Sequence, residues 1–411
     1  MDAKQELKEV LLAHVARYPQ MKALDAIKLI YQNEFGGGHL IEDPEKSMAY
    51  LKQEYEEVAA SAAASSTIRE DLNTEDPIDE DPTDDSGIRT EEIGNGIVRI
   101  YLDGLDTTRY PLSILNRDFV RSAALHQGRS DHFLEKLRVL MELASEGELP
   151  FSLSSLSHEL NEYLDLVSDY HGVKYFPPVS HSDIYHDTYH PAYRIVERRY
   201  SGILLAKELY ECAQALTADL HRSSDAAGTP APHPLLLAID GRCGSGKSTL
   251  AENLHSRFGF SVIHLDHFYL RQEQRTPERY QEPGGNVDRE RFLTEVLHVL
   301  KEARISTPED PQTFTYHPIE HDTFRVSEEA YTIPVTPVMV IEGSYSMHPE
   351  LRDFYDMTVF LHIEPAAQRE RIRSRNGDDL LKMFETKWIP LEEAYFAAYR
   401  PQDICDYYLT V

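Results

Sequence analysis

The residues best suited to chemistry begin at 235–249, LLLAIDGRCGSGKST, where Gly241, Gly246, Lys247 and Ser248 have the spacing G-x-x-x-x-G-K-[ST]. Glycines let the backbone curl so that successive N–H groups point at one anion, and a helix that begins there adds its positive end. In such a loop the lysine reaches the β- and γ-phosphates, and the hydroxyl can ligate Mg²⁺. We therefore predict a site for ATP and Mg²⁺, with phosphate contacts from Gly241, Gly244, Ser245, Gly246, Lys247, Ser248 and Thr249.

Three carboxylates follow predicted strands or turns in the same region. Asp266 ends the apolar run FSVIHLD, where it could take a proton from an attacking hydroxyl or hold Mg²⁺ through water. Glu342 ends the run VMVIE and could assist Mg²⁺. Asp288 follows Pro-Gly-Gly-Asn-Val, and its position at the start of a helix can equally be explained by helix capping alone.

Four arginines occur within seven residues of QRERIRSRNG, at positions 369, 371, 373 and 375. Any one of them could belong to a solvated basic face. In a chain this acidic, however, the cluster suits the charge of a triphosphate. We expect Arg371 and Arg373 to take part in catalysis.

The elements that must position these residues alternate in type. Apolar strands are predicted at 235–239, 260–265, 337–341 and 357–363, with helical segments between them, including 250–258. This rhythm is typical of an α/β domain in which a parallel sheet carries helices on both faces.

The motifs appear in an order that resembles the uridine kinase/phosphoribulokinase family of P-loop kinases. They are IDGRCGSGKST, LDHFY, GGNVD, VIEGSYSMHPELRDFYDMTVFL and the arginine-rich helix, and they cover 235–411. The resemblance implies that Asp266 acts as base on a nucleoside 5′-hydroxyl and that Asp288 holds ribose hydroxyls. Tyr269 of the D-x-F-Y motif would also lie on the substrate side. Tyr316 and His321 have the spacing with which uridine–cytidine kinases read the pyrimidine.

The sequence departs from the family pattern at two points. Asp322-Thr323, rather than an arginine, follows His321, and no second arginine cluster follows Asn376-Gly377. The ATP half of the assignment is therefore better supported than the uridine half. Pantothenate, glycerate and ribulose-phosphate kinases share the framework, so another small-molecule hydroxyl could be the acceptor.

Two other hypotheses remain beside the kinase. One is an ATP-binding regulatory protein in which the loop domain acts as a slow switch for the N-terminal domain. The other is an N-terminal domain that is itself an enzyme acting in sequence with the kinase.

The N-terminal part is predicted to be a mainly helical domain over 1–221. Apolar spacing of three and four predicts helices at 4–16, 21–34, 130–145 and 153–169, and Asn95-Gly96 supplies a turn for a strand pair at 93–103. The acidic segment 60–92 is predicted to be a disordered insertion, because it has few apolar residues. Residues 222–234, rich in Ser, Ala and Pro, are a predicted linker, with a domain boundary near residue 225.

Two N-terminal segments carry unusual residues. EFGGGHLI places three glycines before His39, which suits a tight turn or a close approach to a ligand. The segment 179–196 contains His181, His186 and His190 among three tyrosines. Metal binding, a small-molecule or nucleotide site, and structural packing are all compatible with it.

The composition also constrains the partners and the cellular compartment that we expect for this protein. The chain has 411 residues and a formal net charge of −29, which argues against a nucleic-acid surface. No stretch suggests a membrane span or a signal peptide, and the three cysteines show no metal spacing or disulfide framework, so we expect a cytoplasmic protein. Cys243 in the loop is more easily explained as a small side chain than as a redox switch. The oligomeric state stays open, a homo-oligomer included.

Overall fold

The computed structural model describes residues 3–37, 41, 43–72, 87–169, 176–225 and 232–411. Its packing divides the chain into two compact units, Met1–Ile203 and Leu204–Val411, and each is described by itself. The division falls earlier than the boundary near residue 225 that composition suggested. The Ser/Ala/Pro composition marks the end of a helix, α8 (Gly202–Asp225), whereas the packing changes near the start of that helix.

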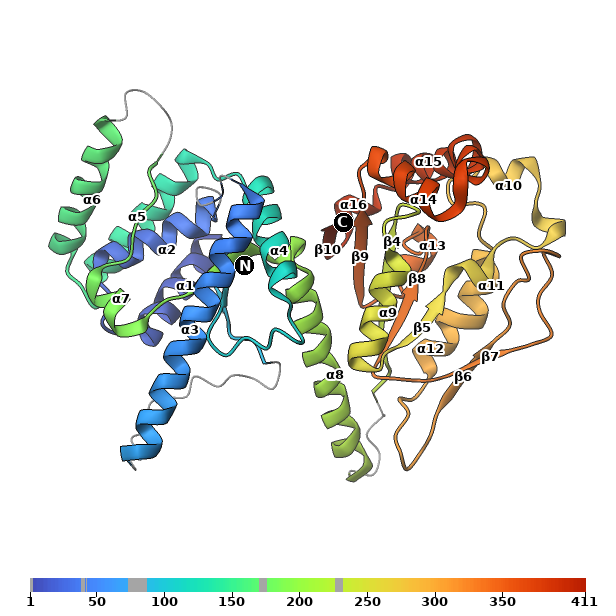
Figure 1. Cartoon of the computed structure of the whole chain (residues 1–411), viewed down its shortest axis with the longest axis horizontal. Coiled ribbons are helices and arrows are strands. Elements are labelled where there is room, and N and C mark those ends of the chain that lie inside the picture. The colour runs from blue at the N-terminus through green and yellow to red at the C-terminus, as the bar shows by residue number, and fades with distance from the viewer. Residues whose placement is uncertain (1–2, 38–40, 42, 73–86, 170–175, 226–231) are drawn as a thin grey trace. The chain divides into compact units, whose positions relative to one another are not determined.

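The N-terminal unit is mainly helical, as expected, and carries one small sheet (Figure 1). Its helices are α1 (Ala3–Arg17), α2 (Ala23–Phe35), α3 (Pro44–Leu72), α4 (Leu112–Leu125), α5 (Ser130–Glu146), α6 (Leu153–Asp169) and α7 (Asp183–Tyr189). The four predicted helices correspond to α1, α2, α5 and α6, which pack on one another around a shared apolar core.

The small sheet has the order β1-β2-β3, with antiparallel pairing throughout, and consists of β1 (Thr90–Glu92), β2 (Ile97–Tyr101) and β3 (Tyr193–Glu197). The predicted turn joins β1 to β2, with φ of 56° at Asn95 and 72° at Gly96. Asparagine and glycine adopt this left-handed region more readily than other residues do. The third strand comes from the histidine-rich segment and was not predicted.

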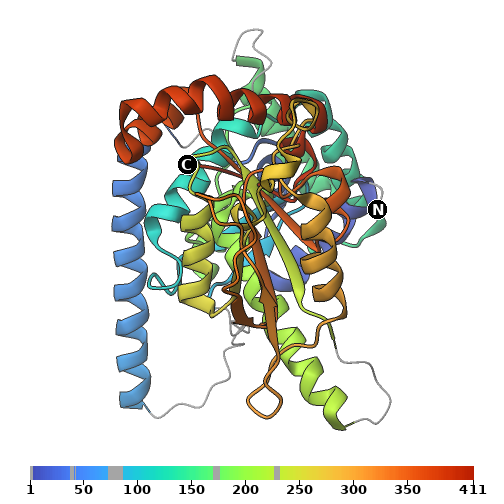
Figure 2. The same cartoon turned by 90° about the vertical axis from the view of Figure 1, so that its right-hand side faces the viewer.

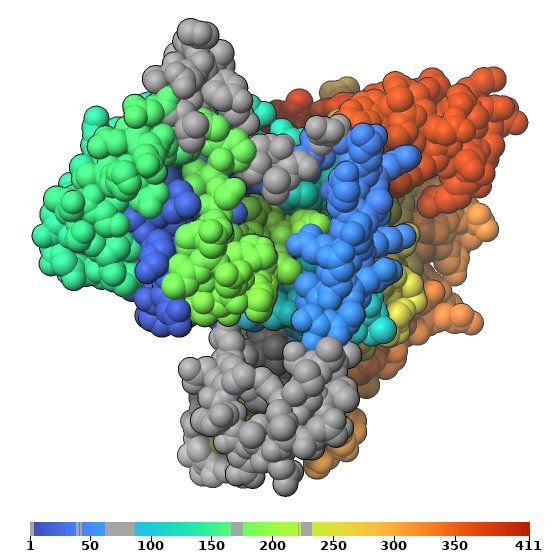
Figure 3. Space-filling view, turned by 60° about the vertical axis from the view of Figure 1, so that its left-hand side comes forward, coloured from blue at the N-terminus to red at the C-terminus, as the bar shows by residue number. Residues whose placement is uncertain are grey.

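Regular structure covers both ends of the segment 60–92, which we expected to be disordered. The helix α3 continues through Leu72, and β1 occupies Thr90–Glu92, while residues 73–86 lie outside the described part of the chain. The alanine-rich start of the segment has high helix propensity, which outweighs its low apolar content. In the space-filling view the first part of α3 forms a column of blue atoms on the surface of this unit (Figure 3).

The C-terminal unit contains a five-stranded parallel sheet of order β10-β9-β4-β8-β5. Its strands are β4 (Leu235–Gly241), β5 (Ser261–His264), β8 (Val338–Glu342), β9 (Met357–His362) and β10 (Tyr407–Thr410). The four strands predicted from apolar runs are confirmed. The edge strand β10 was missed because YYLT is a short run that follows an acidic turn.

Both faces of this sheet are covered by helices, as Figure 2 shows. On one face α9 (Lys247–Phe258) packs against β4, β5 and β8. On the other, Leu236 and Ala238 of β4 share a core with Phe292 and Leu300 from the segment α11–α12. The predicted α/β architecture is therefore confirmed, and alternate residues of β4 face opposite layers.

The C-terminal unit also contains elements outside this sheet. They include a hairpin, β6 (Thr313–Tyr316) with β7 (Tyr331–Pro334), which is antiparallel. The helices are α10 (Pro277–Gln281), α11 (Arg289–Phe292), α12 (His298–Glu302), α13 (Pro349–Arg352), α14 (Pro365–Met383), α15 (Ile389–Tyr399) and α16 (Pro401–Ile404). Among the helices in the described ranges, none combines the length and apolarity needed to cross a membrane.

Candidate functional site

The glycine-rich loop runs from the end of β4 to the start of α9. Gly244 and Gly246 have φ of 74° and 89°, which only glycine adopts without strain. A Cβ on Gly241 would lie 2.2 Å from the carbonyl oxygen of Leu361, so this position must also be glycine. The glycines therefore let the loop make a tight turn between β4 and α9. In such a turn the backbone N–H groups can point toward one bound anion.

The Lys247 ammonium is held by oxygens of the loop and of the turn after β8. Its Nζ donates to the carbonyls of Gly241 and Arg242, both at 2.9 Å, and to Ser344 Oγ at 3.1 Å. These bonds fix a positive charge beside the loop, where a phosphate chain would need it.

A cavity of about 750 Å³ opens at the carboxyl ends of the strands, next to this loop. This is where ligands bind in open α/β sheets. Five predicted site residues line it together with the loop: Ser248, Asp266, Tyr269, Glu342 and Arg371. The remaining wall includes Asn286, Tyr345, Arg375, Phe384, Trp388 and Glu392.

Ser248 and Glu342 form an oxygen pair at the base of the cavity. Ser248 Oγ donates to Glu342 Oε1 at 3.2 Å, and the same carboxylate oxygen lies 2.6 Å from His264 Nδ1. The bond to Glu342 raises the pKa of His264. A hydroxyl and a carboxylate in contact are hard oxygen donors, so the residues present fit the Mg²⁺ that a triphosphate site implies.

Asp266 is exposed within the cavity, and the Tyr269 hydroxyl donates a hydrogen bond to its Oδ1 atom at 3.0 Å. The low polarity of the surrounding protein, and then the Glu342 carboxylate, raise the pKa of Asp266. A carboxylate with a raised pKa and an open face is suited to accept a proton.

Tyr269 also meets the two other rings near this end of the cavity. Its ring lies 6.4 Å from that of Trp388, at an interplanar angle of 19°, and 5.9 Å from that of His321, edge to face. This end of the cavity is therefore lined by aromatic side chains, Tyr269 and Trp388, as well as by Asp266.

The arginines of α14 separate into two groups. Arg371 Nη1 donates to the carbonyl of Gly244 at 3.4 Å, and both Arg371 and Arg375 line the cavity. Arg373 does not line it, because its guanidinium pairs with Glu370 and Asp378 at the helix surface. The expected catalytic role of Arg373 finds no support in this geometry.

Two predicted substrate-binding residues lie away from the cavity wall. Asp288 is 1% exposed and caps α11 through the N–H of Arg291, and its second oxygen accepts from Arg271 Nε. Tyr316 is 3% exposed, packs on Phe268 and contacts His267 Nδ1 at 2.9 Å. The spacing between Tyr316 and His321 matched the family, but Tyr316 faces inward from β6, so only His321 remains near the cavity.

Asp240, immediately before the loop, is a positioning residue that the sequence analysis missed. It is fully buried and accepts from the N–H groups of Gly241, Tyr345 and Met347 and from the hydroxyl of Tyr395. Burial raises its pKa. The signal was available, since an acidic residue at the end of an apolar strand needs buried donors.

Glu392 of α15 was also missed. Its carboxylate accepts from Cys243 N at 2.8 Å and from Ser344 Oγ at 3.0 Å, so it joins the loop to the turn after β8. Burial and the neighbouring Glu392 carboxylate raise the pKa of the Cys243 thiol. This effect is opposite to the one a reactive thiolate needs, and it favours Cys243 as a small packing residue.

In the N-terminal unit His181 packs inside a polar and aromatic network. Its Nδ1 lies 3.2 Å from Asp25 Oδ1, its Nε2 lies 2.8 Å from the Tyr193 hydroxyl, and its ring stacks on Tyr185 at 4.2 Å. Burial lowers the pKa of His181 to about 4. Across the described ranges no group of three His, Cys, Asp or Glu residues is arranged to hold a metal ion, and His39 lies outside those ranges.

Part of the chain is similar in sequence to known kinases. No family model matches the chain. Uridine kinase of Clostridium perfringens is 26% identical over 136 residues, which are 31% of this chain and 61% of that protein. Uridine kinase of Geobacillus kaustophilus is 24% identical over 177 residues, or 41% and 77% of the two chains. The chain thus spans about three fifths of the first of these relatives.

Solved structures give similar neighbours. A structure described as a possible uridine kinase from Bacillus stearothermophilus has 22% identity and a TM-score of 0.33, over 49% of this chain and 99% of that one. D-glycerate 3-kinase from Cryptococcus neoformans has 18% identity and a TM-score of 0.32, over 46% and 88%. The sequence relatives, with the loop, sheet and cavity described above, confirm the resemblance over part of the chain, which is similar to P-loop kinases of the uridine kinase type.

Proposed function

We propose that the C-terminal unit transfers the γ-phosphoryl group of ATP to a hydroxyl of a small molecule. One observation carries this proposal: a single cavity is lined by the phosphate loop, by the Ser248–Glu342 pair, by Arg371 and by the accessible carboxylate of Asp266. Nucleotide binding alone does not require a proton acceptor at the far end of the phosphate site. Phosphoryl transfer to a hydroxyl does.

The residues have distinct parts in this reaction. The loop amides and Lys247 hold the phosphates, and Ser248 and Glu342 are placed to hold Mg²⁺, which would neutralise charge on the transferred group. The acceptor oxygen bonds to the γ-phosphorus while the bond from that phosphorus to the ADP oxygen breaks. Asp266 takes the hydroxyl proton, and Arg371 stabilises the charge that develops on the phosphate oxygens.

The preferred acceptor is the 5′-hydroxyl of uridine or cytidine. The similarity to uridine kinases supports it, and so do the aromatic walls formed by Tyr269 and Trp388, on which a planar base could stack. The inward position of Tyr316 does not favour it. Glycerate and pantothenate are therefore tested beside the nucleosides.

The experiment measures ADP release from Mg-ATP with uridine, cytidine, other nucleosides, glycerate, pantothenate and sugar phosphates. We expect one class of acceptor to stimulate release, and Asp266→Asn to reduce the stimulated rate by about 10²–10⁴-fold. Asp353→Asn is the matched control, because that carboxylate is 86% exposed at the surface. Equal rates in Asp266→Asn and Asp353→Asn would refute the assignment of the base.

The alternative is the ATP-binding regulatory protein. One observation favours it: Arg373, Asp288 and Tyr316 make protein contacts instead of lining the cavity. This alternative predicts ATP binding with slow hydrolysis that no acceptor changes.

A further inference from the structure

His264 is a polar residue of the C-terminal unit to which the proposed reaction gives no part. It is the last residue of β5, and the parallel pairing of β5 with β8 sets it directly beside Glu342, the last residue of β8. Paired residues on neighbouring strands project from the same face of a sheet. The two side chains therefore meet at the carboxyl ends of the strands, next to the cavity that Glu342 lines.

The contact between these two side chains is a direct hydrogen bond. His264 Nδ1 lies 2.6 Å from Glu342 Oε1, and because an ionised carboxylate only accepts hydrogen bonds, the imidazole is the donor. Ser248 Oγ donates to the same oxygen at 3.2 Å. Two donors, one from the end of β5 and one from the first turn of α9, thus hold one oxygen of the carboxylate.

The other oxygen of Glu342, Oε2, is left available. In the described part of the chain it has no hydrogen-bond partner, and it is not one of the buried polar atoms that lack one. Because Glu342 lines the cavity, Oε2 is the oxygen that can meet a cation there. Both oxygens belong to one planar group, so holding Oε1 also fixes the direction in which Oε2 points.

The imidazole is placed to act on this carboxylate rather than on a ligand. His264 does not line the cavity, and 41% of its side chain is exposed. Its ring lies 5.3 Å from that of His267, edge to face, and His267 Nδ1 lies 2.9 Å from the Tyr316 hydroxyl. The ring of His264 therefore packs against a histidine that is itself anchored to the core.

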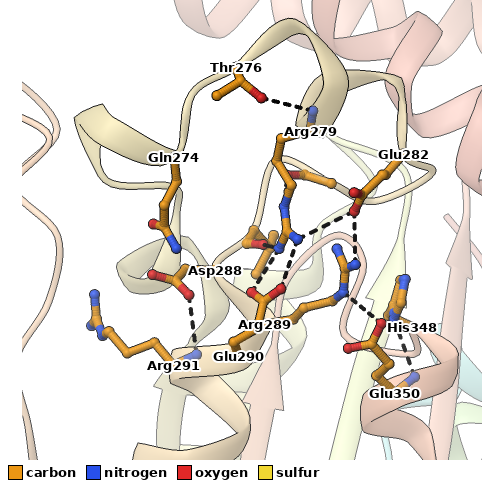
Figure 4. A network of polar contacts seen from close by, with 12 residues as sticks. Gln274, Thr276, Arg279, Glu282, Asp288, Arg289, Glu290, Arg291, His348 and Glu350 are labelled. Atoms are coloured by element: carbon orange, nitrogen blue, oxygen red, sulfur yellow. Dashed lines mark hydrogen bonds and ion pairs between the residues drawn. The ribbon is translucent and has the colours of Figure 1, made fainter.

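The carboxylate of Asp288, which the sequence analysis also singled out, is less suited to a cation. One of its oxygens accepts the N–H of Arg291 and the other accepts Arg271 Nε, both at 3.2 Å. Figure 4 shows Asp288 beside the first turn of α11, where it acts as the helix cap. Both of its oxygens are thus engaged, whereas Glu342 keeps one oxygen without a partner.

We propose that His264 is a positioning residue, which holds Glu342 through Oε1 so that Oε2 can bind the Mg²⁺ of Mg-ATP. The inference rests on the Mg-ATP site of the proposed function. Groups that hydrogen-bond a metal ligand fix its direction, and their removal commonly weakens metal binding about 10- to 100-fold. Since His264 lies outside the cavity wall, its removal should weaken the binding of Mg²⁺ and leave the phosphate contacts of the loop unchanged.

The test measures the dissociation constant of a non-hydrolysable ATP analogue by calorimetry, once with excess Mg²⁺ and once with EDTA. The ratio of the two constants is the gain in affinity that Mg²⁺ provides. We expect His264→Ala to reduce this gain by at least about tenfold and to leave the constant in EDTA unchanged. His264→Asn keeps an N–H donor near the position of Nδ1 and should retain most of the gain.

Two further variants serve as references. Glu342→Gln should lose the gain that the carboxylate provides. His298→Ala removes an exposed imidazole outside the cavity wall and should change neither constant. A full gain in His264→Ala would overturn the inference, and so would a full gain in Glu342→Gln, because the carboxylate would then not bind Mg²⁺.

An equal loss of affinity with Mg²⁺ and with EDTA in His264→Ala would also overturn the inference, because it would show that the imidazole only supports the fold. The measurement contains no acceptor, so its failure is distinct from that of the proposed function. Phosphorylation of an acceptor, with the full Mg²⁺ gain in His264→Ala, refutes only this inference. The absence of a phosphorylated product with every acceptor refutes the proposed function.

Discussion

At the scale of single residues, Asp266 and Glu342 are two carboxylates in one cavity with different partners. Glu342 contacts His264 and also Ser248, which belongs to the glycine-rich motif. Within the described ranges, the Tyr269 hydroxyl is the hydrogen-bond partner of the Asp266 side chain, which is otherwise open to the cavity. These different environments suit Glu342 to binding a cation and Asp266 to accepting a proton.

The raised pKa of Asp266 predicts the acid limb of the pH profile. The low polarity of the surrounding protein and the Glu342 carboxylate favour the protonated form of Asp266, so the base is lost at a higher pH than for an ordinary aspartate, whose pKa is about 3.9. As pH falls, kcat/KM should decline through this raised value, with a slope of one proton. The measurement is kcat/KM against pH for the unmodified protein and Asp266→Asn. An acid limb that is unchanged in the variant would contradict the assignment.

Arg371 and Arg373 of α14 should differ in their effects when replaced. Arg371→Ala removes a cation from the cavity and should lower kcat/KM for ATP about 10- to 100-fold, the range for a hydrogen bond to a charged group. Arg373→Ala breaks only surface ion pairs, which are worth about 0–1 kcal/mol, and should change the rate less than about fivefold. The measurement is kcat/KM for ATP in both variants. Equal decreases in the two variants would contradict the distinction between Arg371 and Arg373.

At the scale of elements, α15 supports the phosphate loop through hydrogen bonds to Asp240 and Cys243. Tyr395 donates its hydroxyl to Asp240, and Glu392 accepts from the loop N–H of Cys243. The loop is therefore fixed by a helix from the end of the chain as well as by its own glycines.

Tyr395→Phe tests this support. Removing the hydroxyl leaves a buried carboxylate with one donor fewer, so we expect the free energy of unfolding to fall by about 1–3 kcal/mol. Tyr399→Phe on the same helix is the control, since Tyr399 is only half-buried and should tolerate the change within about 0.5 kcal/mol. Chemical denaturation of both variants measures the difference. Indistinguishable midpoints would show that Asp240 does not depend on α15.

Local sequence signals predicted the elements that carry them. The apolar runs gave four of the five strands of the main sheet, the periodic helices α1, α2, α5 and α6 were identified, and Asn95-Gly96 predicted the hairpin turn. The strands β3 and β10 were not predicted, because each gains its stability by pairing with a distant strand rather than from its own residues. The helix α3 was not predicted, and its last part falls in the segment 60–92 that was expected to be disordered.

The candidate site was predictable where a motif fixes both residue type and position, as at Lys247, Ser248 and Asp266. It was not predictable where availability depends on tertiary contacts. Asp288 and Tyr316 match the family pattern, yet one caps a helix and the other packs in the core. Conversely, Glu392 matters because it accepts hydrogen bonds from Cys243 N and Ser344 Oγ, which spacing along the chain does not reveal.

At the scale of the whole molecule, the chain has a net charge of −29, yet it gathers Lys247, Arg371 and Arg375 around one cavity. An anion that binds there should stabilise the folded protein through mass action. At a Mg-ATP concentration one hundred times Kd, the gain is about 2.7 kcal/mol.

Lys247→Ala should abolish this gain, because it removes the ammonium that the loop carbonyls hold in place. Thermal unfolding with and without Mg-ATP measures the effect, and Lys301→Ala is the control, since that lysine pairs with Asp356 outside the cavity wall. Equal stabilisation of both variants would place the nucleotide elsewhere.

The most direct test of the central claim is to incubate the full chain with Mg-ATP and each acceptor and to identify the products by mass spectrometry. The account predicts one acceptor class that gains a single phosphoryl group on a hydroxyl, in step with ADP formation, and no such product with Asp266→Asn. ATP binding without a phosphorylated product from any acceptor would contradict the kinase assignment and favour the regulatory alternative.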